Sequence, residues 1–484
     1  MRISIKQVML IFIGLFLFAL EMLMIRVDIN GLSNGWEYRC ALIVLISVVY
    51  SIVTWKIMKF KFISPKFFVL FSLFMFHLSS VLVIGLDKDT TYTTHEMLYR
   101  YGETWGFLGT IYSNFFIYVY VIGIVLFSKK EFENKYNTII RVDESEIRFC
   151  RKIGIIVFMI AILPQLYHDL SQISIKISGG YASMLETEIS FYGIPLGWFT
   201  KLFLPSILII LSSYRYEKKK FTRIMMLTVM YFSIFMLLTG RKGNSIQTFV
   251  PIIFMYFYFF KPKIKMHYII IAYLGIYLVT IVTHIRALEI NDQFIGNFKS
   301  VITEAEPIKD LALEMGGTVK APIQALMAIP STGEFQWGKT YIYSVIYSIS
   351  SGLKIPNNLS KYALFNSYLS QPERGQFINS TVFAMGGSAI AEWYWNFGWC
   401  GIPLVIIFSY FILKYEKILI SRGNKPINFA ILTSFMYYLM RYTRGYFNEI
   451  IWQPIYIYIF IFIISNILRK YKLSIKSKKI MEEK

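Results

Sequence analysis

Residues 106–128 read GFLGTIYSNFFIYVYVIGIVLFS and contain no charged side chain. A membrane-spanning helix needs roughly 20 apolar residues, because a rise of about 1.5 Å per residue must cross about 30 Å of hydrocarbon. This stretch therefore predicts a helix that crosses a membrane. The 484-residue chain is 56% hydrophobic and only 16% charged, and a water-soluble globule needs more polar surface than that.

Comparable apolar stretches recur along the whole sequence. They predict an all-α, polytopic integral membrane protein with about twelve transmembrane helices, at residues 7–25, 40–56, 66–86, 106–128, 152–170, 194–213, 224–240, 246–260, 267–285, 388–413, 427–441 and 450–468. They also predict four regions, namely helices 1–9 with short loops (1–285), one large external loop with helical segments (286–387), helices 10–12 (388–468) and a basic cytoplasmic tail (469–484). Within the loop, 298–315 and 321–328 favour helices, and 337–347 fits either a strand or an amphipathic helix.

The distribution of positive charge predicts how the chain crosses the membrane. The protein has 50 Lys and Arg residues and a formal net charge of +21. Most of these residues fall in the segments that lie inside if the N-terminus is cytoplasmic, as the positive-inside rule requires. Both termini are therefore expected in the cytoplasm. The positive charge is read as a topology signal and a contact with anionic lipid, and no nucleic-acid partner is expected.

The sequence predicts no cofactor and no metal centre. Cys40, Cys150 and Cys400 are far apart and form neither a disulfide framework nor a zinc set. The cytoplasmic connections contain no Gly-rich loop of the kind that holds a nucleotide.

The segment TGRKGN at 239–244 places Arg241 and Lys242 between two glycines at a predicted outer boundary. Glycines let backbone N–H groups approach a phosphate, and a guanidinium donates two parallel hydrogen bonds to it. The alternative is a tight turn whose basic residues meet lipid headgroups. Because cations are disfavoured on the outer side, we favour an anion site.

A second outer cation, Arg286, follows His284 where the ninth predicted helix leaves the membrane. Arg286 is expected to bind substrate. His284 is either a general base, since an imidazole titrates near neutrality, or a structural residue with a hydrogen-bonded ring.

The third cluster is Arg441 and Arg444, three residues apart, followed by Glu449 in the predicted outer turn. If the helix continues, both arginines share one face. Glu449 either pairs with them structurally or leaves net positive charge for a ligand.

The fourth cluster contains Arg374 and Glu392, and Glu392 enters the tenth predicted helix among tryptophans and a tyrosine. A carboxylate in apolar surroundings holds its proton more tightly, as acid–base catalysis requires. The aromatic residues fit an interfacial belt better than a sugar platform. Weaker candidates are Glu21 and His77, which could pair with one another in the interior, and the pair His168–Asp169.

The helix number, the large external loop before the third-last helix and the stretch GGSAIAEWYWNFGWCGI (386–402) resemble the Wzy-type O-antigen and capsule repeat-unit polymerases. The segment TGRKGN is similar to a Gly–Arg element of that family and of the O-antigen ligases. The resemblance implies a lipid-linked glycosyltransferase at the outer face of the cytoplasmic membrane. It would join oligosaccharide repeats carried on undecaprenyl diphosphate, which is also the leaving group, without a metal. A chain-length regulator and a flippase are the further partners to expect.

In such an enzyme the outer cations would hold the diphosphate, and Glu392 or His284 would take the proton of the attacking sugar hydroxyl. The cations are Arg241, Lys242, Arg286, Arg374, Arg441 and Arg444. Two departures from the family pattern stand out. Arg286 and Arg374 each miss an Arg-to-Gly spacing found in some members by one residue, and the external loop lacks the histidine of the ligases. An O-antigen ligase, a lipid-linked oligosaccharide flippase or exporter, and a non-catalytic scaffold are the alternatives.

Overall fold

The computed structural model describes residues 3–28, 35–87, 103–128, 141–187, 189, 196–240, 242–263, 265–287, 306–331, 333–353, 355, 358–369 and 386–482. Within these ranges the protein is all-helical and contains no strand, as predicted. The first half of the chain forms α1 (Ile5–Asp28), α2 (Trp36–Met58), α3 (Pro65–His77), α4 (Ser79–Leu86), α6 (Glu103–Phe127), α8 (Glu144–Glu186), α9 (Gly197–Thr200), α10 (Phe203–Ser213), α11 (Lys218–Thr239), α12 (Lys242–Phe260) and α13 (Met266–Ala287).

The second half begins with short helices and ends with long ones. The short helices are α15 (Pro307–Gly316), η1 (Gly317–Val319), α16 (Lys320–Ala328), α17 (Lys339–Gly352), α18 (Ser360–Ala363) and α19 (Phe365–Leu369). They are followed by α20 (Ala389–Phe397), η4 (Gly398–Cys400), α21 (Gly401–Ser421), α22 (Pro426–Thr443), η5 (Phe447–Ile450) and α23 (Trp452–Glu482).

Among the described residues, seven helices are long and apolar enough to cross a membrane. The bent pair α3–α4, with an angle of 47° between its halves, would make an eighth span. Three further apolar helices, at 197–213, 245–260 and 270–282, are shorter. The structure thus agrees with a polytopic membrane protein, but the count of twelve spans is not confirmed.

Helix α6, which contains the run quoted first above, lies at the centre of one core. Almost every side chain from Phe107 to Val125 is buried, and α1, α2, α3, α16 and α21 pack around it. Two glycines allow the closest approaches. A Cβ at Gly109 would lie 2.4 Å from Ile323, and one at Gly123 would lie 2.6 Å from Ser409. Small residues at these positions let helix backbones approach one another inside a membrane.

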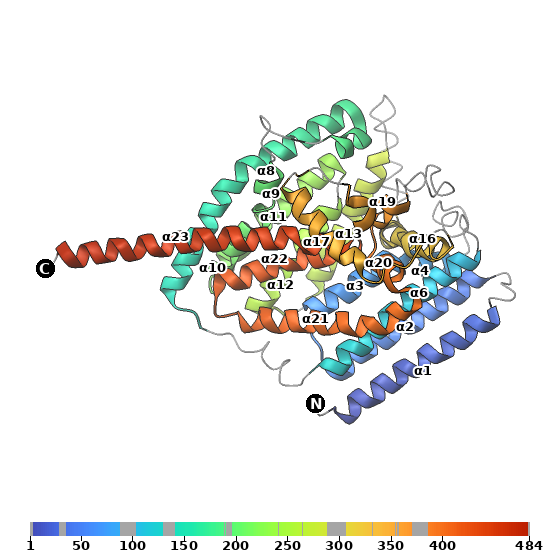
Figure 1. Ribbon diagram of the computed structural model, residues 1–484. Coiled ribbons are helices and arrows are strands. Elements are labelled where there is room, and N and C mark those ends of the chain that lie inside the picture. Colours follow the sequence, from blue (N-terminus) through green and yellow to red (C-terminus); the bar gives the residue numbers. More distant parts are fainter. Residues whose placement is uncertain are drawn as a thin grey trace.

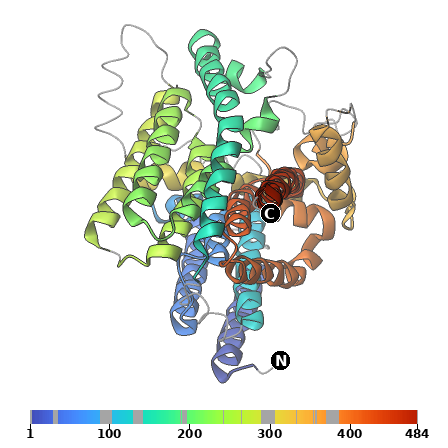
Figure 2. The same cartoon turned by 90° about the vertical axis from the view of Figure 1, so that its left-hand side faces the viewer.

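A second core is built from α8, α10, α11, α12, α22 and α23. Figure 2 shows α8 running along the molecule, with α11–α13 on one side and the C-terminal helices on the other. The two cores meet at α21 and α22, and both include side chains from those helices. The side chains of the second core therefore come from segments far apart in the sequence.

The described part of the predicted external loop packs against the bundle instead of projecting from it. Helix α15 contacts α3, α4 and α13, and α16 contacts α6 and α20, so these yellow and orange helices adjoin the ends of the blue ones in Figure 1. The predicted helices at 298–315 and 321–328 correspond to α15 and α16, although residues before 306 lie outside the described chain. Most of the stretch at 337–347 belongs to a helix, α17, which begins at Lys339, so the helical alternative is the one observed.

Candidate functional site

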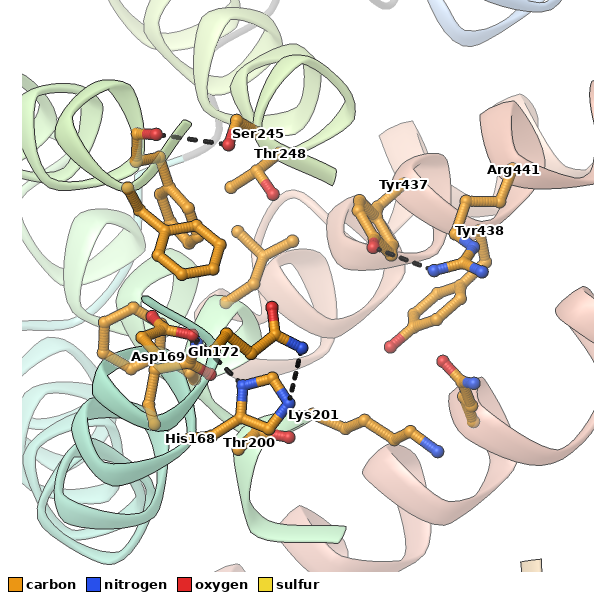
Figure 3. A pocket seen from close by; sticks show the side chains of 16 residues that line it. His168, Asp169, Gln172, Thr200, Lys201, Ser245, Thr248, Tyr437, Tyr438 and Arg441 are labelled. Carbon is orange, nitrogen blue, oxygen red and sulfur yellow. Dashed lines mark hydrogen bonds and ion pairs between the residues drawn. The ribbon is translucent and has the colours of Figure 1, made fainter. Parts of the chain in front are cut away.

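A polar cavity of about 200 Å³ lies among α8, α10, α11, α12, α22 and α23. Its charged or titratable side chains include His168, Asp169, Lys201 and Arg441, and Gln165, Gln172 and Gln453 add amides. Figure 3 shows His168, Asp169 and Gln172 on one side, Tyr437, Tyr438 and Arg441 on the other, and Lys201 along one edge. Such groups are costly inside an apolar bundle, so their convergence indicates a site.

Arg441 is the cation that the structure defines best. Its Nη2 donates to Glu449 Oε1 at 2.9 Å, and its Nη1 donates to the hydroxyl of Tyr437 at 3.3 Å. The side chains of Arg441 and Glu449 are 32% and 20% exposed. The guanidinium is thus oriented by two partners and remains accessible from the cavity.

Lys201 supplies a second cation at the junction of α9 and α10. Lys201 lines the same cavity as Arg441, which is paired with Glu449. Two cations and one carboxylate therefore gather at this side of the cavity. This part of the cavity keeps a net positive charge, which suits an anionic ligand.

The opposite side carries a histidine with an oriented ring. His168 Nδ1 lies 3.2 Å from Asp169 Oδ1, and the two side chains are 27% and 7% exposed. Gln165 Nε2 donates to both carboxylate oxygens of Asp169 at 2.9 Å, and the hydroxyl of Tyr231 donates to Oδ2. The carboxylate is therefore held by α8 and α11 together.

The cavity lies at the end of the bundle that the charge pattern predicts to be outside. His168 is about 36 Å along α8 from Glu144, at about 1.5 Å per residue, and this exceeds the roughly 30 Å of hydrocarbon. Arg441 lies near the end of α22, and Ser245 and Thr248 lie in the first turns of α12. All these helix ends are predicted to be outer ends.

The predicted TGRKGN anion site adjoins this cavity in sequence. Gly240 ends α11 with φ of 74°, the left-handed conformation that glycine adopts at no steric cost. Lys242 then begins α12, and Ser245 lines the cavity. Arg241 lies outside the described residues, and the side chain of Lys242 is not described.

Glu392 occupies a different place, in the interior between α17, α20 and η5. Its side chain is completely buried and does not line the cavity. Its Oε2 accepts from the backbone N–H of Phe447 at 2.9 Å, and its Oε1 accepts from Thr340 Oγ1 at 3.5 Å. Asn396 Nδ2 donates to the same Thr340 hydroxyl at 2.6 Å and to the Glu392 carbonyl at 2.8 Å. Through these bonds Glu392 fixes the turn that follows α22.

Two tyrosines outside the spans surround the Glu392 carboxyl. Burial, together with the neighbouring Tyr442 and Glu392, raises the pKa of Tyr341 well above its ordinary value. Burial likewise raises the pKa of Tyr446, whose hydroxyl accepts from the backbone N–H of Asn366 at 3.0 Å. Both phenols therefore stay protonated at neutral pH.

Arg444 contacts other residues than Arg441 does, although Arg441 lies in the last turn of α22 and Arg444 directly follows that helix. Its guanidinium lies 5.6 Å from the centre of the Phe76 ring and near Gly386. His77 is close by, and its Nε2 lies 2.8 Å from Ser388 Oγ, the hydroxyl that caps α20. The predicted pair of arginines is therefore divided between two sides of one turn.

The suggested pairing of Glu21 with His77 is wrong. Glu21 Oε2 accepts from Asn114 Nδ2 at 3.0 Å, whereas His77 contacts Ser388 and the carbonyl of Leu73. Each residue has its own polar partner: Glu21 bonds to Asn114 of α6, and His77 bonds to Ser388, which caps α20.

The other predicted site residues cannot be placed in this cavity. Arg374 lies outside the described residues. His284 and Arg286 belong to the last turn of α13, but their side chains are not described. Their roles stay predictions. In the described part of the chain, no group of three His, Cys, Asp or Glu residues could hold a metal ion.

A family model, O-antigen polysaccharide polymerase Wzy, matches residues 6–476. The chain belongs to the Wzy family. The match covers nearly the whole sequence and confirms the resemblance found in its motifs and helix pattern. No curated protein and no solved structure matches the chain.

Several charged and titratable side chains that line this cavity were ranked low or missed in the sequence. His168 and Asp169 appeared only as weak candidates, and Lys201 was not singled out. A signal was present, because Gln165, His168, Asp169 and Gln172 follow the three-and-four spacing of one helix face. A polar stripe of this kind on a predicted span marks an interior surface or a site.

Proposed function

We propose that the protein polymerises oligosaccharide repeat units carried on undecaprenyl diphosphate, at the outer face of the cytoplasmic membrane. The Wzy family acts on lipid-linked repeat units in a membrane, which supports the general activity. In the proposed reaction a sugar hydroxyl attacks the anomeric carbon of a second lipid-linked chain, and undecaprenyl diphosphate leaves. The single observation that carries the proposal is the cavity at the predicted outer end of the bundle, which Arg441 and Lys201 line together.

Arg441 and Lys201 would bind the diphosphate. A guanidinium forms paired, charge-assisted hydrogen bonds with phosphate oxygens, and an ammonium adds a mobile point charge. Glu449 holds Arg441 in the absence of ligand, and the remaining positive charge attracts the anion. During the reaction the same cations would stabilise the negative charge that develops on the leaving diphosphate.

The size of the cavity fits part of the substrate rather than all of it. The cavity has a volume of about 200 Å³ and is partly open to its surroundings. It would hold the diphosphate group while the rest of the substrate lies outside it. The sugars would therefore extend into the outer solvent, and the prenyl chain would lie along apolar helix surfaces.

The other cations predicted to hold the diphosphate are assigned from their positions in the chain. Arg241 and Lys242 precede the cavity-lining Ser245 by one turn of chain, so they would extend the cationic rim. Arg286, Arg374 and Arg444 would contact the substrate outside the described cavity. We propose that no metal is needed, because these cations supply the positive charge, and that a chain-length regulator and a flippase work with the protein.

For Glu392, the structure supports a role in positioning. Its carboxyl group accepts from the backbone N–H of Phe447 and so orients the turn that begins at Arg444, directly after the helix end that carries Arg441. A direct acid–base role for Glu392 would require a path for substrate that the described cavity does not provide.

The test uses the purified full-length protein in lipid nanodiscs, with lipid-linked repeats extracted from cells that lack it. Polymer length is read on gels for Arg441→Met and Lys201→Met. Removing one such donor costs about 100-fold or more in turnover, so both variants should yield little polymer. Arg469→Met is the matched control, because Arg469 is exposed, pairs with Glu146 and lies at the predicted cytoplasmic end.

Full-length polymer from the Arg441 and Lys201 variants would reject the proposal that these two residues bind the diphosphate, which we call the diphosphate clamp. A wild-type protein that moves lipid-linked repeats across the membrane without extending them would reject polymerisation in favour of export. Transfer only to a different acceptor would favour a ligase.

A further inference from the structure

His168 and Asp169 form an oriented pair in the same cavity, apart from the two cations that would bind the diphosphate. They follow one another near the outer end of α8, and Nδ1 of His168 faces the carboxylate of Asp169 at 3.2 Å. Asp169 is nearly buried, and His168 is partly open to the cavity. An open imidazole backed by a buried carboxylate is an arrangement that accepts a proton.

The carboxylate of Asp169 is fixed from two helices. Gln165 lies one turn earlier on α8 and donates to both of its oxygens, while Tyr231 on α11 donates to one of them. All these partners donate, so the carboxylate remains an acceptor for the ring N–H of His168. This fixes the tautomer that has the proton on Nδ1 and a free electron pair on Nε2.

The other ring nitrogen is directed toward the cavity and meets only a weak contact there. Gln172 Nε2 lies 3.4 Å from His168 Nε2, so the amide donates to the ring at the long end of the hydrogen-bond range. Figure 3 shows this amide beside the ring, on the cavity side. A sugar hydroxyl that reached this position would replace the amide as the donor.

We propose that His168 is the base that accepts the proton of the attacking sugar hydroxyl, with Asp169 as its positioning residue; this rests on the proposed function. The hydroxyl oxygen forms a bond to the anomeric carbon of the donor sugar. The bond from that carbon to the diphosphate oxygen breaks, and its electron pair leaves with the diphosphate. The hydroxyl proton moves to Nε2 of His168, which becomes an imidazolium beside Asp169.

The charges that line the cavity agree with a proton acceptor on one side and a diphosphate-binding group on the other. The imidazolium forms next to a carboxylate, while the departing diphosphate meets Arg441 and Lys201 on the other side. Each charge that develops therefore has an opposite charge on its own side. Arrangements fixed before the reaction stabilise a transition state without reorganisation.

The expected effects separate the base from the clamp. Loss of a proton acceptor costs about 100-fold to 10,000-fold in rate. His168→Gln should therefore lower kcat at least about 100-fold and leave the KM for lipid-linked donor nearly unchanged. Asp169→Asn should lower kcat by about tenfold or more, because an amide N–H facing Nδ1 favours the wrong tautomer. Asp169→Glu should recover part of the loss.

The experiment measures kcat and KM in nanodiscs and, separately, binding of undecaprenyl diphosphate alone. Tyr167→Phe is the control for α8, since Tyr167 is exposed and does not line the cavity. Normal diphosphate binding with a low kcat in His168→Gln supports the base. A kcat within about threefold of wild type would overturn it, and so would a parallel loss of diphosphate binding.

The outcome also separates this inference from the proposed function. Inactive Arg441→Met together with active His168→Gln would reject the base and keep the diphosphate clamp. A wild-type protein that extends no lipid-linked repeats would reject both. If His168→Gln does not fold, Asp169→Asn decides the matter, because an unchanged kcat in that variant contradicts the pair.

Discussion

Two polar clusters lie in this apolar bundle, and they differ in access. Glu392, Thr340 and Asn396 form a closed network, in which two bonds join α17 to α20 and a third lies within α20. His168 and Asp169 form a network that is closed on the buried side and open on the cavity side. The first is suited to holding structure, and the second to meeting a ligand.

The comparison shows that burial alone does not identify a reactive group. A buried carboxylate such as Glu392 attracts attention in a sequence because charged residues in membrane helices are rare. Once its partners are known, it explains the position of the turn after α22. His168 becomes the stronger candidate because one of its ring nitrogens is fixed and the other remains accessible.

The largest effect on stability is expected at a fully buried ion pair between α3 and α21. Lys66 Nζ lies 3.3 Å from Glu416 Oε1, and both side chains are fully buried. Lys66→Met would leave the carboxylate of Glu416 buried without its main cation. The free energy of unfolding should fall by about 3–5 kcal/mol, measured by denaturant titration of the purified protein in mixed micelles.

A double variant distinguishes the charge from the packing at this pair. Glu416→Gln added to Lys66→Met removes the uncompensated charge and keeps an acceptor for the backbone N–H of Lys66. Most of the lost stability should return. If the double variant is no more stable than Lys66→Met, the pair contributes through shape and not through charge.

The next effect tests whether Glu392 holds structure or performs chemistry. Glu392→Ala leaves the N–H of Phe447 without its acceptor, and this should cost about 1–3 kcal/mol. Glu392→Gln keeps the size and an acceptor oxygen, so its stability should stay within about 1 kcal/mol of wild type. Polymer length on gels and denaturant titration are measured on the same preparations.

The glutamine variant gives the sharper result. Normal polymer from Glu392→Gln supports positioning, because the neutral side chain can still accept from Phe447. A folded Glu392→Gln protein without polymer would show that the carboxylate takes part in the reaction, as the sequence suggested. The interpretation that the Glu392 cluster only holds structure would then be wrong.

The sequence predicted the fold class better than it predicted the geometry of the bundle and of the cavity. Apolar runs such as 106–128 and the glycine-flanked cations at 239–244 are local signals, so they can be recognised without the structure. The divergence of Arg441 and Arg444 could not be predicted, because it depends on the turn that Glu392 fixes through a backbone contact. The number of spans was also uncertain, since short or bent helices such as α3 and α4 do not carry a simple length signal.

The smallest effect concerns the hydroxyl of Tyr231, which donates to Asp169 from α11. Tyr231→Phe keeps the ring contacts with Phe203 and Phe232, so the free energy of unfolding should fall only by the lost hydrogen bond, about 1 kcal/mol. Loss of one hydrogen bond of about 1 kcal/mol should lower kcat about fivefold, with KM unchanged, because Gln165 still holds the carboxylate. Turnover is measured in nanodiscs beside Tyr167→Phe. A shift in stability with no change in kcat would show that the open cluster, like the closed one, only holds helices together.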